Sequence, residues 1–317
     1  MGKTNELLNN KIGSAIQYFR ESYGITQSKL CKGLCSVATL SRIEAGERDV
    51  DSLLLETLLE RLGRMPNQFE LILTDFDYLI YQNRIEIKNL INEKDYEKAY
   101  DLLKEYEQIT ASKGSAHMQF VVYCRALLNE SQGGAVEETI NLLMEAITYT
   151  VPDFKTHKIM DYYLSSSELG IIIDILQRLI VTGNVESSKD ILEQVLNYLE
   201  LQALSEDTNQ TYAKVAVMAC KLYLSEDNIW KAQEMCDKGL EKSKGSRRMD
   251  YLGDLYSIKA ETTELLLKQE GKWDASNNEC LKYYLQAYHI YHFFEDNTEA
   301  ELIMKHLEEE YQWADID

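Results

Sequence analysis

The chain has 317 residues, of which 45% are hydrophobic and 27% are charged, the balance of an ordinary soluble globular protein large enough for about two domains. Proline occurs only twice, which favours long uninterrupted helices, and no apolar run reaches the roughly 18 residues needed to span a bilayer. The chain starts without the apolar segment of a secretory signal, and its six cysteines are widely spread, so we expect a cytoplasmic protein with reduced thiols.

The net charge of −20 is unevenly distributed along the chain. Residues 1–66 hold nine Lys and Arg against eight Asp and Glu, a net charge of +1, which leaves −21 for residues 67–317. An acidic surface repels phosphate, so contact with nucleic acid is expected from the first segment alone. We interpret residues 1–66 and residues 67–317 as two domains.

Four short helices are predicted in residues 1–66, at about 12–23, 27–33, 37–44 and 52–62. Thr26, Ser36 and Asp51 precede the last three of them and are good residues for capping a helix N-terminus. Leu40 and Ile43 form the inward stripe of the third helix. Several short helices with a tight turn between the second and the third are typical of a helix-turn-helix unit.

The third helix of such a unit enters the major groove of DNA, so its outward side chains must be small or polar. The outward positions here are Ser36, Val37, Ala38, Thr39, Ser41 and Arg42. Arg42 can contact guanine or phosphate, and Val37 can meet a thymine methyl group. Gln27, at the positive end of the second helix, is placed to grip the DNA backbone. The alternative for each residue is an ordinary solvated position on a small helical bundle.

These residues also carry a resemblance to a known family. The sequences ITQSKL at 25–30, GLCS at 33–36 and LSRIEAG at 40–46 resemble the lambda-repressor or Xre-type helix-turn-helix, and the short Leu-Cys-Ser turn is similar to that of PlcR-like regulators. The resemblance covers about residues 10–64. In that family an Arg on the first helix pairs with the Glu that follows the recognition helix. The resemblance therefore implies a structural ion pair between Arg20 and Glu44.

Residues 67–317 are predicted to form helix after helix, separated by short polar breaks. The second helices of successive pairs are expected to begin near Tyr96, Ala135, Val185, Ile229 and Asn277. Their spacing of about 40 to 50 residues exceeds the 34 of an ideal tetratricopeptide repeat, although DYEKAYDLLKEYEQ at 95–108 resembles its second helix. A final helix from Thr298 to about Trp313 is expected to cap the stack. The predicted fold class is all-α: an N-terminal helix-turn-helix bundle followed by a right-handed superhelix of degenerate tetratricopeptide-like helix pairs.

Stacked helix pairs curl around a concave groove lined by the first helix of each pair, a surface that suits extended peptides. The predicted peptide-binding residues lie on those first helices and are Asn83, Tyr123, Asn129, Gln177, Tyr212 and Tyr256. An Asn or Gln side chain can bond a peptide group through both amide atoms. The alternative for each residue is a plain packing or surface role.

The whole layout resembles the Rgg/Rap/NprR/PlcR/PrgX group of Gram-positive bacteria. This resemblance implies an intracellular quorum-sensing receptor for a short signalling peptide, which works as a homodimer on double-stranded DNA. One alternative is a helical-repeat scaffold that binds another protein and uses the DNA-binding module only as a tether. A second is a phosphatase like some repeat proteins of the related group, but we find no catalytic set, metal site or cofactor motif, so no enzyme is predicted.

Overall fold

The structure is a computed structural model that describes residues 2–47, 50–65, 67, 71–72, 74–154, 159–202, 204, 208–247 and 249–312. Every regular element in these ranges is a helix, which confirms the predicted all-α fold class. The chain divides into two compact units, Met1–Glu206 and Asp207–Asp317. The predicted boundary between residues 66 and 67 is a different division and stays a prediction. None of the described helices combines the length and apolarity that a membrane span requires.

The first unit opens with the four helices predicted for the N-terminal segment, α1 (Gly2–Ser22), α2 (Gln27–Leu30), α3 (Val37–Glu44) and α4 (Ser52–Arg61). The predicted N-caps are confirmed. Thr26 accepts a hydrogen bond from the Lys29 amide at 3.2 Å, Ser36 from the Thr39 amide at 3.0 Å and Asp51 from the Leu54 amide at 3.1 Å. Each cap satisfies an N–H group that the first turn of a helix leaves without an intrahelical partner.

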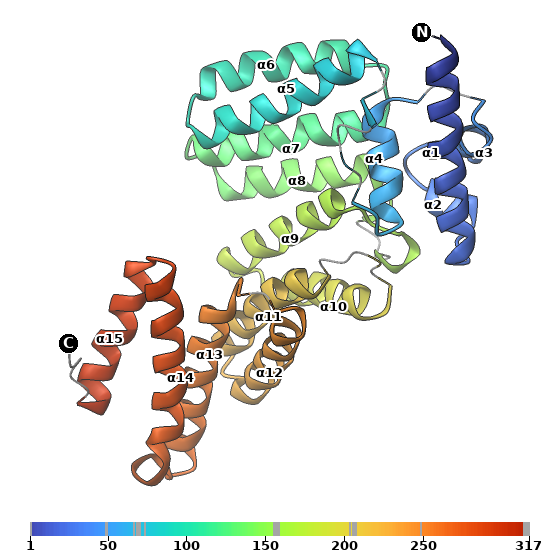
Figure 1. The fold of residues 1–317 in the computed structure, drawn as a ribbon. Coiled ribbons are helices and arrows are strands. Elements are labelled where there is room, and N and C mark those ends of the chain that lie inside the picture. The colour runs from blue at the N-terminus through green and yellow to red at the C-terminus, as the bar shows by residue number, and fades with distance from the viewer. Residues whose placement is uncertain are drawn as a thin grey trace. The chain divides into compact units, whose positions relative to one another are not determined.

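The rest of the first unit consists of the helices α5 (Asp75–Asn92), α6 (Tyr96–Thr110), α7 (Ser115–Ser131), α8 (Val136–Thr150), α9 (Ser166–Val181) and α10 (Val185–Leu201), with a short 3₁₀ turn at Ile159–Asp161. Consecutive helices pack against each other, and Figure 1 shows α5 to α8 lying side by side. Helix α4 contacts α7, and Tyr163 and Leu204 pack against the apolar core of α1 to α4. The N-terminal helices and the first helix pairs therefore share one packed body.

The second unit contains α11 (Thr208–Ser225), α12 (Ile229–Ser246), α13 (Leu252–Gln269), α14 (Trp273–Phe293) and α15 (Asn297–Tyr311). Each packs on the next, and the last three enclose a core that includes Cys280, Ala287 and Ile303. Second helices begin within one residue of the predicted starts at four of five sites, and α14 begins four residues earlier than predicted. The predicted end of the last helix, Trp313, lies outside the described residues.

Four helices, α6, α10, α12 and α15, begin with the same turn. The N-cap is an Asp or Asn whose side chain accepts the backbone N–H three residues later, at Asp95, Asn184, Asn228 and Asp296. The residue before each cap has a left-handed backbone, at Lys94, Gly183, Asp227 and Glu295. Such a turn reverses the chain within a few residues and starts the next helix at once. Its recurrence shows that the repeat unit is a helical hairpin.

Candidate nucleic-acid interface

The inner face of α3 is packed tightly against α1. A Cβ atom on Gly13 would lie 2.0 Å from the carbonyl oxygen of Ile43, so this approach requires glycine. Ile16, Leu40 and Ile43 are buried in the shared core. Because that inner stripe is held from behind, α3 presents its opposite face in a fixed orientation.

A buried ion pair joins the ends of α1 and α3. Arg20 donates from Nε to Glu44 Oε1 at 2.6 Å and from Nη2 to Oε2 at 2.9 Å, and its Nη1 donates to the Ile25 carbonyl at 2.9 Å. Arg20 is 9% exposed and Glu44 is 5% exposed. The hydrogen bond to Glu44 raises the pKa of Arg20 further above its usual value. This is the pairing that the family resemblance implied, and it fixes the geometry of three segments at once.

The predicted DNA-reading positions lie at the N-terminus and on the outward face of α3. Ser36, Val37, Ala38, Ser41 and Arg42 are exposed, with Val37 at 44%. Thr39 is half-buried, and its hydroxyl shares a hydrogen bond of 2.9 Å with that of Ser36. Arg42 forms no ion pair with any residue that the structure describes. The strip is thus available to a partner, while the role of each residue in DNA binding stays a prediction.

Gln27 occupies a different environment from the rest of the set. Its side-chain amide donates to Glu44 Oε2 at 2.7 Å, and the residue is half-buried. One of its donors therefore supports the ion pair with Arg20. A phosphate contact by Gln27 stays a prediction, and it would have to come from the second N–H of the side-chain amide.

Arg61, at the last turn of α4, forms a second buried ion pair that the sequence reasoning missed. Its Nε and Nη2 donate to the two carboxylate oxygens of Glu168 at 3.0 and 2.5 Å. Its Nη1 donates to the carbonyls of Leu30 and Lys32 at 2.9 and 2.7 Å, and Nη2 also donates to the Thr150 carbonyl at 3.1 Å. Both charged side chains are fully buried. All five N–H donors of the guanidinium are used.

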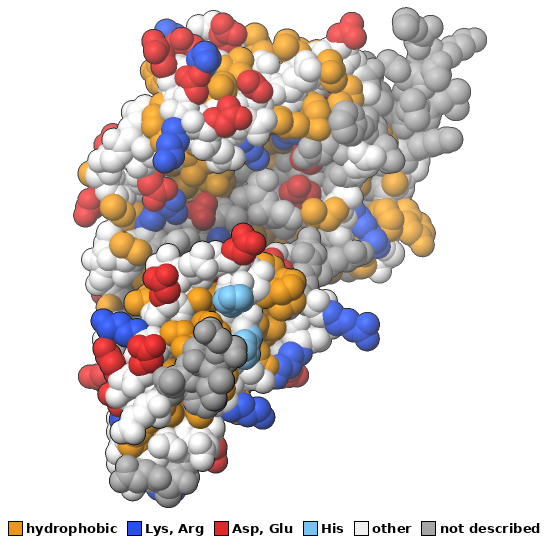
Figure 2. All heavy atoms as spheres, turned by 60° about the vertical axis from the view of Figure 1, so that its left-hand side comes forward, with side chains coloured by type: hydrophobic (Ala, Val, Ile, Leu, Met, Phe, Trp, Pro, Cys, Tyr) orange, Lys and Arg blue, Asp and Glu red, His pale blue; other side chains and the backbone are white. Residues whose placement is uncertain are grey.

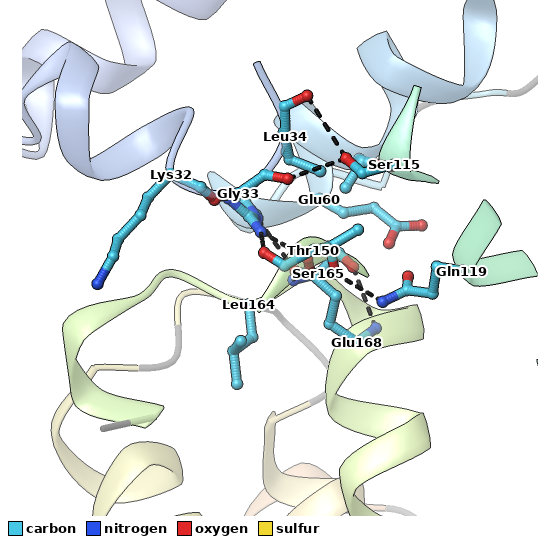
Figure 3. A network of polar contacts seen from close by, with 12 residues as sticks. Lys32, Gly33, Leu34, Glu60, Ser115, Gln119, Thr150, Leu164, Ser165 and Glu168 are labelled. Atoms are coloured by element: carbon cyan, nitrogen blue, oxygen red, sulfur yellow. Dashed lines mark hydrogen bonds and ion pairs between the residues drawn. The ribbon is translucent and has the colours of Figure 1, made fainter. Parts of the chain in front are cut away.

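The turn between α2 and α3 is held by the same network (Figure 3). Gly33 has a left-handed backbone, and a Cβ there would lie 2.0 Å from the Thr150 carbonyl oxygen. Ser115, at the start of α7, donates from its hydroxyl to the Gly33 carbonyl at 2.9 Å. The helix-turn-helix is therefore bonded to the start of α7, to the end of α8 and to the start of α9, where Ser165 and Glu168 form a capping box.

The predicted peptide-binding residues have varied surroundings. Gln177 is exposed and Asn83 is half-buried. Tyr123 donates from its hydroxyl to Asp174 at 3.2 Å, and Asn129 donates to the Thr139 hydroxyl at 3.0 Å. In the second unit, Tyr256 is half-buried and stacks on Tyr283 with ring centroids 6.3 Å apart.

The structure does not support Tyr212 as a member of the predicted peptide-binding set. Its side chain is 2% exposed, because it lies on the face of α11 that packs into the second unit. The Lys242 ammonium is 5.6 Å from the ring centroid. Tyr212 contributes to the core and offers no surface to a ligand in the described conformation.

Comparison with known families matches residues 16–66 to the helix-turn-helix family. These residues form a helix-turn-helix domain. The match spans α2, α3 and α4 and includes Arg20 and the exposed strip of α3, so the predicted resemblance is confirmed for this segment. No curated protein sequence matches the chain significantly.

Two solved structures with the same fold over nearly the whole chain are those of PlcR from Bacillus thuringiensis. One holds the peptide PapR7 and DNA, with 20% identity, a TM-score of 0.54 and coverage of 93% of this chain and 99% of that one. The other is the apo form, with 18% identity, a TM-score of 0.54 and coverage of 93% and 98%. At this identity the comparison establishes the common fold of the helix-turn-helix domain and helix pairs.

In the face shown in Figure 2, acidic and basic side chains are both scattered among hydrophobic ones. Residues 67–317 carry the net charge of −21 that follows from the whole-chain value of −20. Within the described ranges, no group of three or more His, Cys, Asp and Glu side chains is arranged to hold a metal ion.

Proposed function

We propose that this protein is a sequence-specific transcription regulator that reads DNA with the outward face of α3 and is controlled by a short peptide bound on the first helices of its helix pairs. The observation that carries the DNA-binding half is the exposed strip at residues 36–42, held from behind by the buried pair of Arg20 and Glu44. Small polar side chains and one exposed Arg, on a helix whose inner face is packed in the core, suit contact with base edges.

The peptide-sensing half rests on the repeat architecture and on one relative. PlcR, which shares the fold, was solved with the peptide PapR7 and DNA together. The residues proposed to contact a peptide are those on the first helices that keep some exposure, Asn83, Tyr123, Asn129, Gln177 and Tyr256. A ligand shifts a conformational equilibrium only by its difference in affinity for the two states, so the peptide must favour one DNA-binding state over another.

We further propose that the protein acts as a homodimer. Two copies would place their α3 helices in successive turns of the major groove, about 34–36 Å apart. The operator would then be an inverted repeat with half-sites about one helical turn apart. Sedimentation of the protein with and without such a duplex measures this directly, and a one-to-one monomeric complex would contradict it.

The test of DNA reading is fluorescence anisotropy with a duplex from the region upstream of the gene. Arg42→Ala is expected to weaken binding by about 1–3 kcal/mol, on the order of tenfold to a hundredfold, without changing the melting temperature. Arg125→Ala is the matched control, because Arg125 is a partly exposed Arg of α7 whose partner is Glu107. Equal DNA affinity for Arg42→Ala and wild type at moderate salt would contradict the proposed reading face.

A repeat scaffold with a tethering module is the second candidate. It predicts DNA binding that is indifferent to sequence and to any peptide. A short peptide encoded beside the gene is the probe for this distinction, because a specific ligand stabilises the folded protein by RT ln(1 + [L]/Kd). A rise in melting temperature together with a change in operator affinity supports the regulator.

A further inference from the structure

Two cysteines lie in the turn between α2 and α3. Cys31 is the C-cap of α2, and Cys35 directly precedes Ser36, the N-cap of α3. The Cys35 N–H donates to the Cys31 carbonyl at 3.1 Å, and the two thiols are hydrogen-bonded to each other. A turn closed by such a backbone bond holds its ends roughly 6 Å apart, within the range of Cα separations that a disulfide bridges.

The surroundings of this pair favour reaction at sulfur. Cys31 is 2% exposed, whereas Cys35 is half-buried, so one member of the pair is open to a small molecule. The hydrogen bond with Cys35 lowers the pKa of Cys31 to about 7, burial opposes this shift, and the Arg61 guanidinium adds to it. The bond from Cys31 Sγ to the Ser28 carbonyl is long, at 4.0 Å. A cysteine that loses its proton near neutral pH is a nucleophile.

A second pair, Cys220 on α11 and Cys236 on α12, is the internal comparison. Its two thiols are also within hydrogen-bonding distance of each other. They donate to the backbone carbonyls of Ala232 and Leu255 at 3.2 and 3.0 Å, and both residues are fully buried. The contact with Cys236 and burial raise the pKa of Cys220. Thiols that are protonated and shielded in this way are inert, so proximity of two cysteines is not enough for reactivity.

We propose that Cys31 and Cys35 form a redox-sensitive modification site, at which a hydroperoxide converts their two thiols to a disulfide. The thiolate attacks one peroxide oxygen, the O–O bond breaks, and the departing oxygen takes up a proton and leaves as water or an alcohol. The second thiol then attacks the sulfenic acid on the first sulfur, which forms the S–S bond and releases water. The two sulfur atoms together lose two electrons, and the hydroperoxide gains them.

The new bond changes the position of α3. A disulfide is about 2.05 Å long, much shorter than a hydrogen bond between two sulfur atoms, so the two residues must move together. Arg61 and Ser115 hold three carbonyl groups of residues 30–33, so the first part of the turn is fixed. The part that can move is Cys35 and the N-cap after it. Oxidation therefore displaces the N-terminus of α3, and the consequence for DNA binding rests on the proposed function.

The test of the site is tryptic peptide mapping of the full chain after exposure to hydrogen peroxide, with the remaining thiols alkylated under denaturing conditions. Trypsin cleaves after Lys32, between the two cysteines, so the peptides 30–32 and 33–42 stay together only if they share a disulfide. We expect these linked peptides, and we expect dithiothreitol to separate them. Cys220 and Cys236 in the same sample are expected to be alkylated as thiols.

Separate peptides with Cys31 and Cys35 alkylated, or overoxidised without linkage, overturn the proposal, and this arm needs no variant to fold. Linkage of Cys220 to Cys236 under the same conditions overturns the contrast between the two pairs. The oxidised protein is expected to migrate as a monomer on a non-reducing gel. A disulfide-linked dimer overturns the assignment of the bond to a single chain.

Fluorescence anisotropy with the operator tests the consequence for α3. Oxidation is expected to lower the affinity of wild type for the operator about fivefold, the effect of one lost helix cap, and dithiothreitol is expected to restore it. Cys35→Ala is expected to bind like reduced wild type with or without peroxide, and a peroxide-dependent loss in this variant overturns the role of the pair. Linked peptides with unchanged operator affinity overturn the effect on α3. Linked peptides in a protein that never binds the operator support the disulfide and reject the proposed function.

Discussion

Helices α3 and α4 belong to the same small module but are placed in opposite ways. Helix α3 buries only Leu40, Ile43 and Glu44 of its eight residues. Helix α4 buries eight of its ten, including four polar or charged ones, Ser52, Glu56, Thr57 and Arg61. Burial of charged side chains is costly unless each has a partner, and those partners come from outside the module, from Arg84 and Glu168.

This contrast indicates that α3 and α4 have different roles in the module. An exposed helix face with small polar groups is available to another molecule, and in α3 that face is the proposed contact with DNA. A helix with most of its residues buried connects the elements around it. Helix α4 connects the module to α5, α7 and α9 through ion pairs and the wall of a cavity that these helices share. Substitutions in α4 should therefore lower the stability of the fold, whereas substitutions on the outward face of α3 should lower the affinity for DNA.

The largest effect on stability is expected from removing the ion pair between α4 and α9. Arg61→Ala leaves Glu168 as a fully buried charge without its partner, so we expect a loss of about 5 kcal/mol in the free energy of unfolding. Urea denaturation followed by circular dichroism measures it. Arg125→Ala, at a partly exposed pair, should cost under about 1 kcal/mol. Similar losses of unfolding free energy for the two variants would show that α4 does not hold the module to the helix pairs.

The next effect is expected inside the module. Arg20→Ala removes the bidentate bonds to Glu44 and the bond to the Ile25 carbonyl, and should cost about 3 kcal/mol. Hydrogen exchange of α1 and α3 amides should accelerate, and DNA affinity should fall because α3 loses its orientation. Arg20→Lys keeps the positive charge but loses the paired N–H donors of the guanidinium, so its stability and DNA affinity should lie between those of wild type and Arg20→Ala. Unchanged exchange and DNA affinity would refute this structural role.

The smallest effect is a dependence on pH through Glu60. Burial raises its folded pKa to about 7, above the ordinary value of 4.5, so the folded chain holds the proton more tightly than the unfolded chain. This contribution to stability is fully present below pH 4.5 and is lost as the pH rises through about 7. Glu60→Gln should therefore reduce the loss of stability between about pH 5 and pH 8.

The charged groups around Glu60 are Glu56 and Arg61 on α4, Arg84 and Lys88 on α5, and Glu168 on α9. Thermal unfolding across the range gives the difference between wild type and Glu60→Gln. Parallel curves for the two proteins would exclude a raised pKa at Glu60.

Much of the helical layout could be predicted because its signals are local. Ser36, Asp51 and Asp95 cap helices through backbone groups three residues away, so their effect needs no knowledge of the fold. The Asn that caps α10 and the Asn that caps α12 are also visible in the sequence, and the predicted starts of these helices, Val185 and Ile229, agree with the structure to the residue. The early start of α14 was not visible, because Trp273 packs edge-to-face on Tyr311, 38 positions later in the chain.

The candidate site divides in the same way. The exposed strip of α3 and the pair of Arg20 and Glu44 followed from helical periodicity and a specific family resemblance. The prediction for Tyr212 failed because an aromatic on a helix packs inward as readily as it lines a groove. The cavity had no signal in the sequence, since its walls come from four helices spread between Leu53 and Ile171.

By itself the amino-acid sequence determined where helices start, which faces are apolar, and that the N-terminal module turns a small polar face outward, because caps and periodicity act over a few residues. Only the tertiary structure decided that Arg61 would meet Glu168 across 107 positions, that Gly33 would touch Thr150, and that Glu60 would line a cavity together with residues of α5, α7 and α9. Those contacts depend on how separate helices stack, and stacking is set by the packing of whole surfaces, which no short segment encodes.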